Sequence, residues 1–291
     1  MVITLGDLYL QTRRALLTKE DKDTAGFYAR QLLLCVTGLT HEQFLMQREH
    51  YASEANCLET ARLVQRLLAG EPIAYILGEW EFYGMKLMVN PNVLIPRDDT
   101  CAVTELAIRQ AACLEDCPRI LDLCTGSGCI GLAVASNVEN AKVTLADISQ
   151  EALQVAKRNT ANNKLTARVS CVRANALEKP SAFLGKFDLI VSNPPYITTR
   201  EMRDLPDSVA RFEPRLALHG GSDGLDFYRA ITENYTEALK PGGYLCFEFG
   251  MGQGDAVCAL LEENGFTILE RSRDYNDRER AVLARYDRKD A

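Results

Sequence analysis

The stretch "ILDLCTGSGCIG", residues 120–131, decides the fold that we expect for this chain. It begins as an apolar strand ending near Asp122, turns through several glycines and leads into a helical segment. Gly126, Gly128 and Gly131 have the spacing G-x-G-x-x-G, in which glycines let the backbone turn tightly and approach a ligand closely. A strand, such a turn and a helix predict one unit of a parallel α/β sheet.

The pattern around this turn extends from about residue 100 onward as alternating strands and helices. Helical crossovers between most strands indicate a parallel sheet that is covered on both faces. A short connection between the last two strands predicts an antiparallel hairpin at one edge. We therefore expect a doubly wound, Rossmann-like α/β sheet, mostly parallel, with seven strands. The expected strands span residues 119–124, 142–148, 168–173, 187–191, 243–249, 266–271 and 280–285.

The chain before the sheet has a different pattern. Residues 1–75 show helical periodicity without strand signals, with helix ends near Gly38 and Gly70, so we expect a small all-helical domain. Residues 76–98 are rich in β-forming residues and punctuated by Gly and Pro, which predicts a hairpin linker. Residues 99–291 then form the α/β domain.

Composition and charge exclude several classes of protein. The chain has 291 residues, of which 47% are hydrophobic and 25% charged, as in a globular protein with a well-filled core. The net charge of −7 disfavours wholesale binding to a nucleic-acid backbone. No apolar run is long enough for a membrane span or a signal peptide, so we expect a cytoplasmic protein. The 10 cysteines form no C-x-x-C pair and the 3 histidines are scattered, so we expect no metal site.

An acid follows the glycine turn at the distance typical of nucleoside binding. Asp147 ends the next strand, in "VTLADIS", where a carboxylate can bind ribose hydroxyls. The alternative is a mere turn with an N-capping aspartate. A nicotinamide dinucleotide would place its pyrophosphate on the helix N-terminus. Asp122 lies just before the turn and suits a cation better than a pyrophosphate, which favours S-adenosylmethionine, whose sulfonium and ammonium groups are both positive.

The sequence "VSNPPY", residues 191–196, indicates the chemistry. The nitrogen of a planar NH₂ group is a poor nucleophile, and a site can orient it by accepting hydrogen bonds from both N–H groups. Asn193 offers a side-chain carbonyl, Pro194 a backbone carbonyl in a chain stiffened by proline, and Tyr196 a ring that can stack on a flat amide or base. Positioning and electrostatics then supply most of the rate without a metal or covalent nucleophile. The alternative is a Pro-Pro turn that only closes the strand.

Several blocks together resemble a known family. "NPPY" after "FDLIVS", with "DLCTGSG" and "LADIS" upstream, is similar to class I methyltransferases that use S-adenosylmethionine. The linker "AGEPIAYILGEWEFYGMKLMVNPNVLIPRDDT" and the later "FEPRLALHGGSDGLDFYRAI" and "LKPGGYLCFEFGMGQ" resemble the HemK/PrmC-type protein-(glutamine-N5) methyltransferases. The resemblance covers roughly residues 70–286. It implies methylation of the side-chain amide of the glutamine in the Gly-Gly-Gln loop of class I peptide chain release factors, with the N-terminal helical domain helping to hold that protein substrate.

The resemblance also implies roles for individual residues. The residues implied for cofactor binding are Asp122, Cys124, Thr125, Gly126, Ser127, Gly128, Asp147 (ribose), Asn175 and Ala176 (adenine) and Asn193. Those implied for the substrate amide are Asn193, Pro194, Pro195, Tyr196 and Arg97, with Asn193, Pro194 and Tyr196 catalytic. Glu248 ends the fifth strand, where packing and catalysis are equal alternatives.

The chain departs from the usual family pattern at four places. Cys124 stands where glycine is usual and should narrow the approach of the cofactor slightly. Asn175 replaces an acid in the adenine segment, which keeps a hydrogen-bonding group and loses a charge. The linker has Asp98 and Asp99 in "IPRDDTC" where "IPRPETE" is more usual, and a commonly glycine-containing turn near the C-terminus reads "YNDRER".

Other functions stay open at this level. A sister activity would methylate a glutamine of a ribosomal protein. The tetrapeptide could also bind the exocyclic amine of a flipped adenine in DNA or RNA, although the acidic balance and the absence of a basic arm disfavour this. The glycine spacing alone would allow a nicotinamide oxidoreductase. A catalytically silent binding module has no positive support in the sequence, because the site residues are present. We expect a monomer that binds neither nucleic acid nor membrane.

Overall fold

The computed structural model describes residues 3–287. These residues form two compact units. One comprises residues 3–78 together with 207–212, and the other comprises 79–206 together with 213–287.

The first unit is helical throughout. Thr40 begins one helix by accepting a hydrogen bond from the backbone N–H of Gln43, and Gly38 ends the preceding helix with φ at 68°. Leu16, Leu32 and Leu33 are fully buried between the helices. Its helices are α1 (Leu5–Leu16), α2 (Lys22–Thr37), α3 (His41–Gln47), α4 (Glu54–Leu68), α5 (Ile73–Leu77) and α9 (Asp207–Ala210).

The second unit begins with a hairpin and continues as an α/β sheet. Its strands are β1 (Glu79–Phe82), β2 (Met85–Met88), β3 (Arg119–Leu123), β4 (Lys142–Asp147), β5 (Val169–Arg173), β6 (Phe187–Ser192), β7 (Leu239–Glu248), β8 (Phe266–Arg273) and β9 (Glu279–Tyr286). Its longer helices are α6 (Cys101–Ala112), α7 (Cys129–Asn137), α8 (Gln150–Asn162), α10 (Asp226–Asn234) and α11 (Gly254–Glu263). Short 3₁₀ helices are η1 (Asp98–Thr100), η2 (Ala182–Leu184), η3 (Glu201–Arg203), η4 (Arg215–Ala217) and η5 (Tyr235–Ala238).

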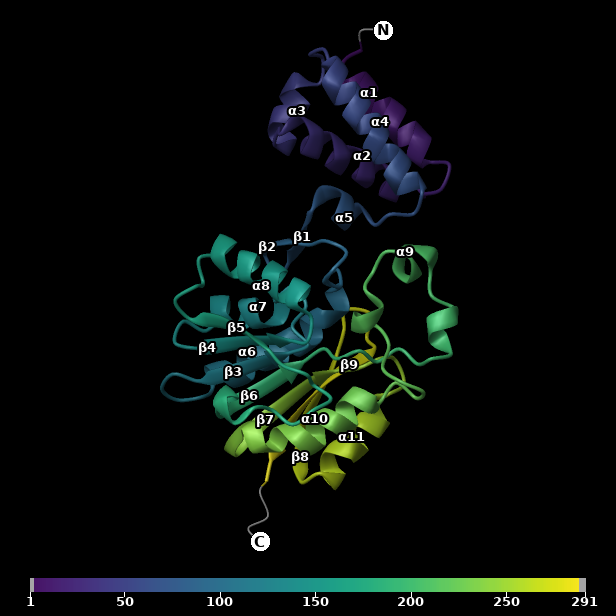
Figure 1. Cartoon of the computed structure of the whole chain (residues 1–291). Helices are drawn as coiled ribbons and strands as arrows, with labels where there is room; N and C mark the ends of the chain where they lie inside the picture. Colours follow the sequence, from purple (N-terminus) through teal and green to yellow (C-terminus); the bar gives the residue numbers. More distant parts are fainter. Residues whose placement is uncertain (1–2, 288–291) are drawn as a thin grey trace. The chain divides into compact units, whose positions relative to one another are not determined.

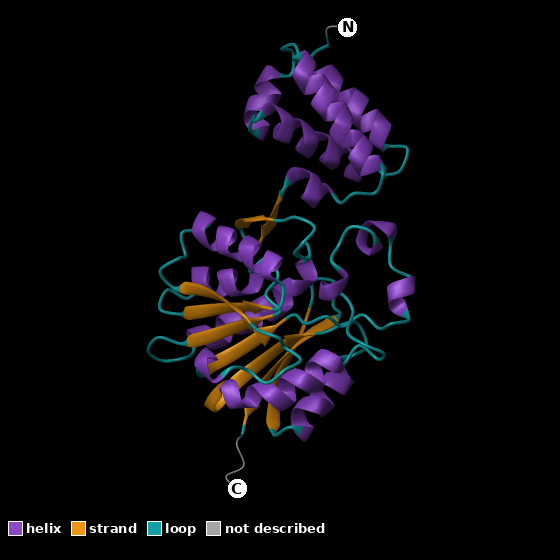
Figure 2. Ribbon diagram, in the orientation of Figure 1, coloured by secondary structure: helices purple, strands orange, loops and turns teal. Residues whose placement is uncertain are grey.

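The large sheet has seven strands in the order β5-β4-β3-β6-β7-β9-β8 (Figure 1). Five are parallel, and β9 runs antiparallel to both β7 and β8. Helices lie on both faces of this sheet (Figure 2). One buried cluster takes apolar residues from α6, α7 and α8, and a second takes them from α10 and α11. The expected fold class is confirmed, including the antiparallel hairpin at the edge.

The sheet order explains where a ligand can bind. The chain moves outward from β3 to β4 and β5 and then returns to the other side of β3 with β6. This reversal opens a crevice at the carboxyl ends of neighbouring strands, which is where open α/β sheets bind ligands. The glycine turn follows β3, Asp147 ends β4 and Asn193 follows β6, so all three meet at this crevice.

One strand is longer than the sequence pattern predicts. Strand β7 begins at Leu239 rather than near residue 243, because Leu239 pairs with Phe187 before an irregularity in the register. Gly242 has a positive φ of 70° there, so the Pro-Gly-Gly segment forms a bulge instead of ending the strand. Within residues 3–287, no helix is long and apolar enough to cross a membrane, and no cluster of three metal-ligating side chains occurs.

Candidate active site

A cavity of about 390 Å³ lies at the carboxyl edge of the sheet. This volume is within the range of small-molecule sites. The residues implied by the sequence that line it are Cys124, Thr125, Gly126, Ser127, Asp147, Asn175, Ala176, Asn193 and Pro195. Those that do not line it are Asp122, Gly128, Pro194, Tyr196 and Arg97.

Asp122 lies behind the glycine turn and not on the cavity surface. It is 1% exposed, and its Oδ2 accepts hydrogen bonds from the Thr125 hydroxyl at 2.6 Å and the Gly131 backbone N–H at 2.9 Å. Its Oδ1 is buried and has no partner among the described residues. Burial raises the pKa of Asp122 to about 7. An uncompensated carboxylate therefore sits directly under the turn.

The three glycines of the turn have different functions in the structure. Gly126 and Gly128 have φ values of 55° and 86°, which favour glycine. A Cβ on Gly131 would lie 2.3 Å from Leu145 and 2.9 Å from Asp122, so this glycine permits close packing of α7 on the sheet. Cys124 has φ at 62°, in the left-handed region that favours glycine.

Asp147 shapes the turn and also faces the cavity. Its Oδ2 accepts a hydrogen bond from the Gly126 N–H and its Oδ1 accepts one from the Ser149 N–H, both at 2.9 Å. Burial raises its pKa, and the backbone hydrogen bonds partly oppose that change. Each carboxylate oxygen keeps a free lone pair, so both can still accept from ribose hydroxyls.

The charges around the cavity discriminate between cofactors. Among the described residues no Lys, Arg or His lines it, whereas Asp147 and Glu151 do and Asp122 lies beneath it. A pyrophosphate would meet no cationic side chain from residues 3–287 here, and the charged side chains near it would all be acidic. A ligand with positive groups would relieve the uncompensated carboxylate of Asp122. The residues present therefore fit S-adenosylmethionine and do not fit a dinucleotide.

Asn175, which the sequence analysis named, lines the cavity from a local turn in which its Oδ1 accepts from the Leu177 N–H and its Nδ2 donates to Glu178. Two lining residues were missed by sequence reasoning: Leu216 in η4 and Phe227 in α10, which provide apolar surface. Their signal was present in "FEPRLALHGGSDGLDFYRAI", but that block was not resolved into individual residues.

The Asn193 side chain is oriented by a neighbour distant in sequence. Its Nδ2 donates to the hydroxyl of Thr100 at 3.3 Å. Thr100 is 2% exposed and follows the linker, and both residues line the cavity. The Oδ1 of Asn193 and the carbonyl of Pro194 accept no hydrogen bond from the residues that the structure describes. Two acceptors of the "NPPY" segment are thus left available.

The hydroxyl group of Tyr196 faces the buried carboxyl group of Glu248. Its hydroxyl lies 3.5 Å from Oε1 of Glu248, which is 2% exposed at the end of β7. Burial raises the pKa of Glu248 to about 7, whereas hydrogen bonding to Thr100 and the charge of Arg280 lower it. Arg280 in turn pairs with Asp99 at 3.0 Å, which explains one of the two acids in the linker.

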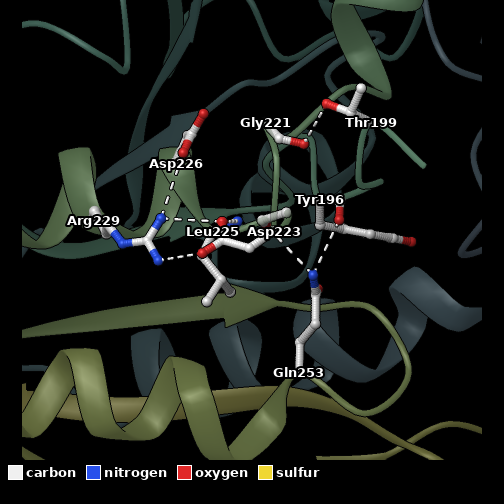
Figure 3. Close-up of polar contacts among 9 residues, drawn as sticks. Tyr196, Thr199, Gly221, Asp223, Leu225, Asp226, Arg229 and Gln253 are labelled. Carbon is white, nitrogen blue, oxygen red and sulfur yellow. Dashed lines mark hydrogen bonds and ion pairs between the residues drawn. The ribbon is translucent and has the colours of Figure 1, made fainter. Parts of the chain in front are cut away.

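The side chain of Gln253 holds the backbone of Tyr196 in place. Gln253 donates from its Nε2 to the carbonyl of Tyr196 at 3.1 Å (Figure 3) and accepts on its Oε1 from the Gly250 N–H at 2.9 Å. A Cβ on Gly224 would lie 2.3 Å from the Tyr196 carbonyl oxygen, so only glycine permits this approach. The Thr199 hydroxyl bonds the carbonyl of Gly221 in the same region (Figure 3). Gln253 after β7, together with Gly221 and Gly224, therefore fixes the loop that carries Tyr196.

Arg97 lies outside the cavity lining. Its guanidinium forms an ion pair with Glu213, whose side chain is 1% exposed. Glu213 also accepts from the backbone N–H of Ile95 at 3.3 Å. The contact joins the linker to the segment that carries Leu216, so a structural function for Arg97 is visible directly.

Comparison with known proteins agrees with this fold. Residues 9–78 match the family described as the PrmC N-terminal domain, and residues 104–209 match the methyltransferase small domain. A methyltransferase structure from Pyrococcus furiosus, 16% identical, covers 78% of this chain and all of its own with a TM-score of 0.50, a likeness of fold alone. Fold and domain match together define a class I methyltransferase.

The similarity to curated proteins is more specific. The release factor glutamine methyltransferase of Clostridium acetobutylicum is 38% identical over 91% of this chain and 93% of its own. The protein of the same name from Neisseria gonorrhoeae is 40% identical over 89% and 92%. This chain belongs to the release factor glutamine methyltransferase family.

Proposed function

We propose that this chain transfers a methyl group from S-adenosylmethionine to the side-chain amide N5 of the glutamine in the Gly-Gly-Gln motif of class I release factors. The relatives' names support release factors as the substrate. The orientation of Asn193 carries the chemical part of the proposal, because its free Oδ1 can accept a hydrogen bond from an amide N–H.

The loop after β6 would hold the amide in a reactive position. Asn193 Oδ1 accepts from one N–H and the carbonyl of Pro194 accepts from the other, which fixes the plane of the amide and leaves more electron density on nitrogen. The ring of Tyr196 can stack on that plane. As the nitrogen would form its bond to the methyl carbon, the bond from that carbon to sulfur would break, and the amide would lose one proton to water, which leaves S-adenosylhomocysteine and a neutral N-methylamide.

The turn after β3 would hold the donor on the other side of the cavity. S-adenosylmethionine supplies an electrophilic methyl group on a sulfonium centre. Asp147 would accept from its ribose hydroxyls, and the charge of Asp122 would favour its cationic groups from beneath the turn. Asn175 and Ala176 would flank the adenine together with the apolar surface of Leu216.

The experiment incubates the purified chain with S-adenosylmethionine and a purified class I release factor, and then maps methylation by peptide mass spectrometry. We expect one added methyl group on the glutamine of the Gly-Gly-Gln peptide. A ribosomal protein and an adenine-containing oligonucleotide serve as parallel substrates. Methylation of either of these in place of the release factor would overturn the proposed substrate.

A further inference from the structure

A buried asparagine outside the cavity joins three parts of the chain that are distant in sequence. Asn159 lies in α8 and is 0% exposed. Its Oδ1 accepts from the Met88 N–H at 2.6 Å, and its Nδ2 donates to the Met88 carbonyl at 3.0 Å and to the Ser127 carbonyl at 2.9 Å. Met88 ends β2 of the hairpin, and Ser127 lies in the glycine turn, residues 124–128, between β3 and α7. One side chain therefore connects the hairpin, the helix and the turn.

An amide is the side-chain group that satisfies these three partners together. The Met88 N–H needs an acceptor and the two carbonyls need donors, and asparagine presents one oxygen and two N–H groups. An ionised aspartate would have no donor for either carbonyl, and a leucine of similar size would leave all three backbone groups unpaired. Unpaired backbone groups are costly when they are buried. Packing alone would not require this residue type.

The bond to Ser127 holds a residue that faces the cavity with an unpaired group. Ser127 lines the cavity and is 2% exposed, and its hydroxyl has no hydrogen-bond partner among the described residues. Asn159 is the one described residue that donates to the Ser127 carbonyl. The next residue, Gly128, has φ at 86°, and glycine leaves the backbone there free to adopt other conformations. The bond from Asn159 therefore determines how Ser127 is presented to a ligand.

We propose that Asn159 is a positioning residue for the methyl donor, which holds the glycine turn in its binding conformation and anchors that turn to the hairpin. The inference rests on the proposed function for the identity of the donor. Asn159 does not line the cavity, so it acts through Ser127 and not by contact with the ligand. The hairpin that follows the helical unit is thereby part of the support of the donor site.

Three variants separate this function from general support of the fold. Asn159→Leu removes the amide and keeps a similar volume. Asn163→Ala is the control for the hairpin, because Asn163 Nδ2 donates to the Lys86 carbonyl of β2 at 3.3 Å and to the Asn159 carbonyl, and neither acceptor lies in the turn. Thr160→Val is the control for burial, because Thr160 is 4% exposed and its hydroxyl donates to the Ala156 carbonyl of its own helix at 2.8 Å.

The readouts are the free energy of unfolding, the Kd of S-adenosylhomocysteine by calorimetry, and kcat and the donor KM with a release factor. We expect Asn159→Leu to raise the Kd and the donor KM at least about tenfold, with a smaller change in kcat at saturating donor. The two controls should keep the Kd near wild type even where they lower stability. A wild-type Kd in folded Asn159→Leu, or an equal rise in Asn163→Ala, would overturn the inference.

A second readout uses the wild-type chain and does not require the variant to fold. The side-chain NH₂ groups of Asn159 and Asn163 can be followed by ¹⁵N–¹H NMR while S-adenosylhomocysteine is added. We expect the Asn159 signals to shift, because one of its N–H groups donates to the Ser127 carbonyl, and the Asn163 signals to stay in place.

The two proposals fail in different ways in this experiment. Shifted Asn159 signals, together with a release factor that stays unmethylated, would overturn the proposed substrate and support the positioning of the turn. Methylation of the release factor with unchanged Asn159 signals at saturating ligand would support the proposed function and refute the positioning.

Discussion

The unpaired carboxylate of Asp122 leads to a prediction in which stability and ligand binding change in opposite directions. The side chain is 1% exposed, its Oδ2 is held by Thr125 and Gly131, and its Oδ1 has no partner in residues 3–287. We expect Asp122→Asn to stabilise the ligand-free protein above about pH 7 and to weaken its affinity for S-adenosylmethionine.

The size of the expected gain in stability follows from the raised pKa of Asp122. The interval between the ordinary carboxyl value of 3.8 and about 7 corresponds to roughly 4 kcal/mol that the folded protein loses when Asp122 ionises. The amide of asparagine can keep both existing hydrogen bonds on its oxygen. Its NH₂ then replaces the unpaired Oδ1 and remains unpaired, which costs about 1–3 kcal/mol. The net gain at pH 8 should be about 1–3 kcal/mol.

The difference in stability between Asp122→Asn and the wild type depends on pH. Because the pKa of Asp122 is raised in the folded state, the folded protein holds the proton more tightly, and wild-type stability falls as pH rises from about 4 to about 7. Asparagine does not titrate. The advantage of the variant should therefore be complete above about pH 7 and absent below about pH 4.

The assay is urea unfolding at about pH 4 and pH 8, combined with calorimetric titration of S-adenosylmethionine at pH 8. Asp188→Asn is the control, because Asp188 pairs with Lys240 at the opposite end of β6 and its loss should leave donor affinity unchanged. A variant less stable than wild type at pH 8 would refute the burial argument. Unchanged donor affinity would refute the match between this carboxylate and a cationic ligand.

Three further substitutions test other parts of the site. Asn193→Ala should cost about 2–4 kcal/mol of transition-state stabilisation and leave donor affinity near wild type, and a near-normal kcat would contradict this. Cys124→Gly should raise the free energy of unfolding by up to about 1 kcal/mol, because the cysteine has φ at 62°, and a lower melting temperature would count against strain there. Gly224→Ala should lower kcat/KM with native circular dichroism, since its Cβ would lie 2.3 Å from the Tyr196 carbonyl oxygen, whereas Gly242→Ala, also at positive φ but with open space, should not.

The backbone of the site could be predicted from sequence because its signals are local. A strand, positive-φ glycines and a helix adjoin in residues 120–131, and a crossover topology brings Asp147 and Asn193 to the same edge. Alternation of strands and helices was sufficient for the sheet, and the bulge in β7 was missed because Pro and Gly are read as strand breakers.

Contacts between distant residues could not be predicted. Asn193 and Thr100 are 93 residues apart, and their spatial relation depends on how the linker crosses the sheet edge. Gly131 completes the sequence motif, yet it packs against Leu145 and Asp122 instead of facing the cavity. From residue type alone, Asp122 was expected to contact a ligand. The fold instead buries its side chain behind the turn, away from the cavity surface.

The most direct measurement is a crystal structure of this chain with S-adenosylhomocysteine and a glutamine peptide from the Gly-Gly-Gln loop. We predict that the amide nitrogen of the glutamine will donate to Asn193 Oδ1 and to the Pro194 carbonyl and face the sulfur of the bound product. A glutamine amide bound away from the "NPPY" loop, or an Asn193 amide turned so that its nitrogen faces the peptide, would contradict the mechanism.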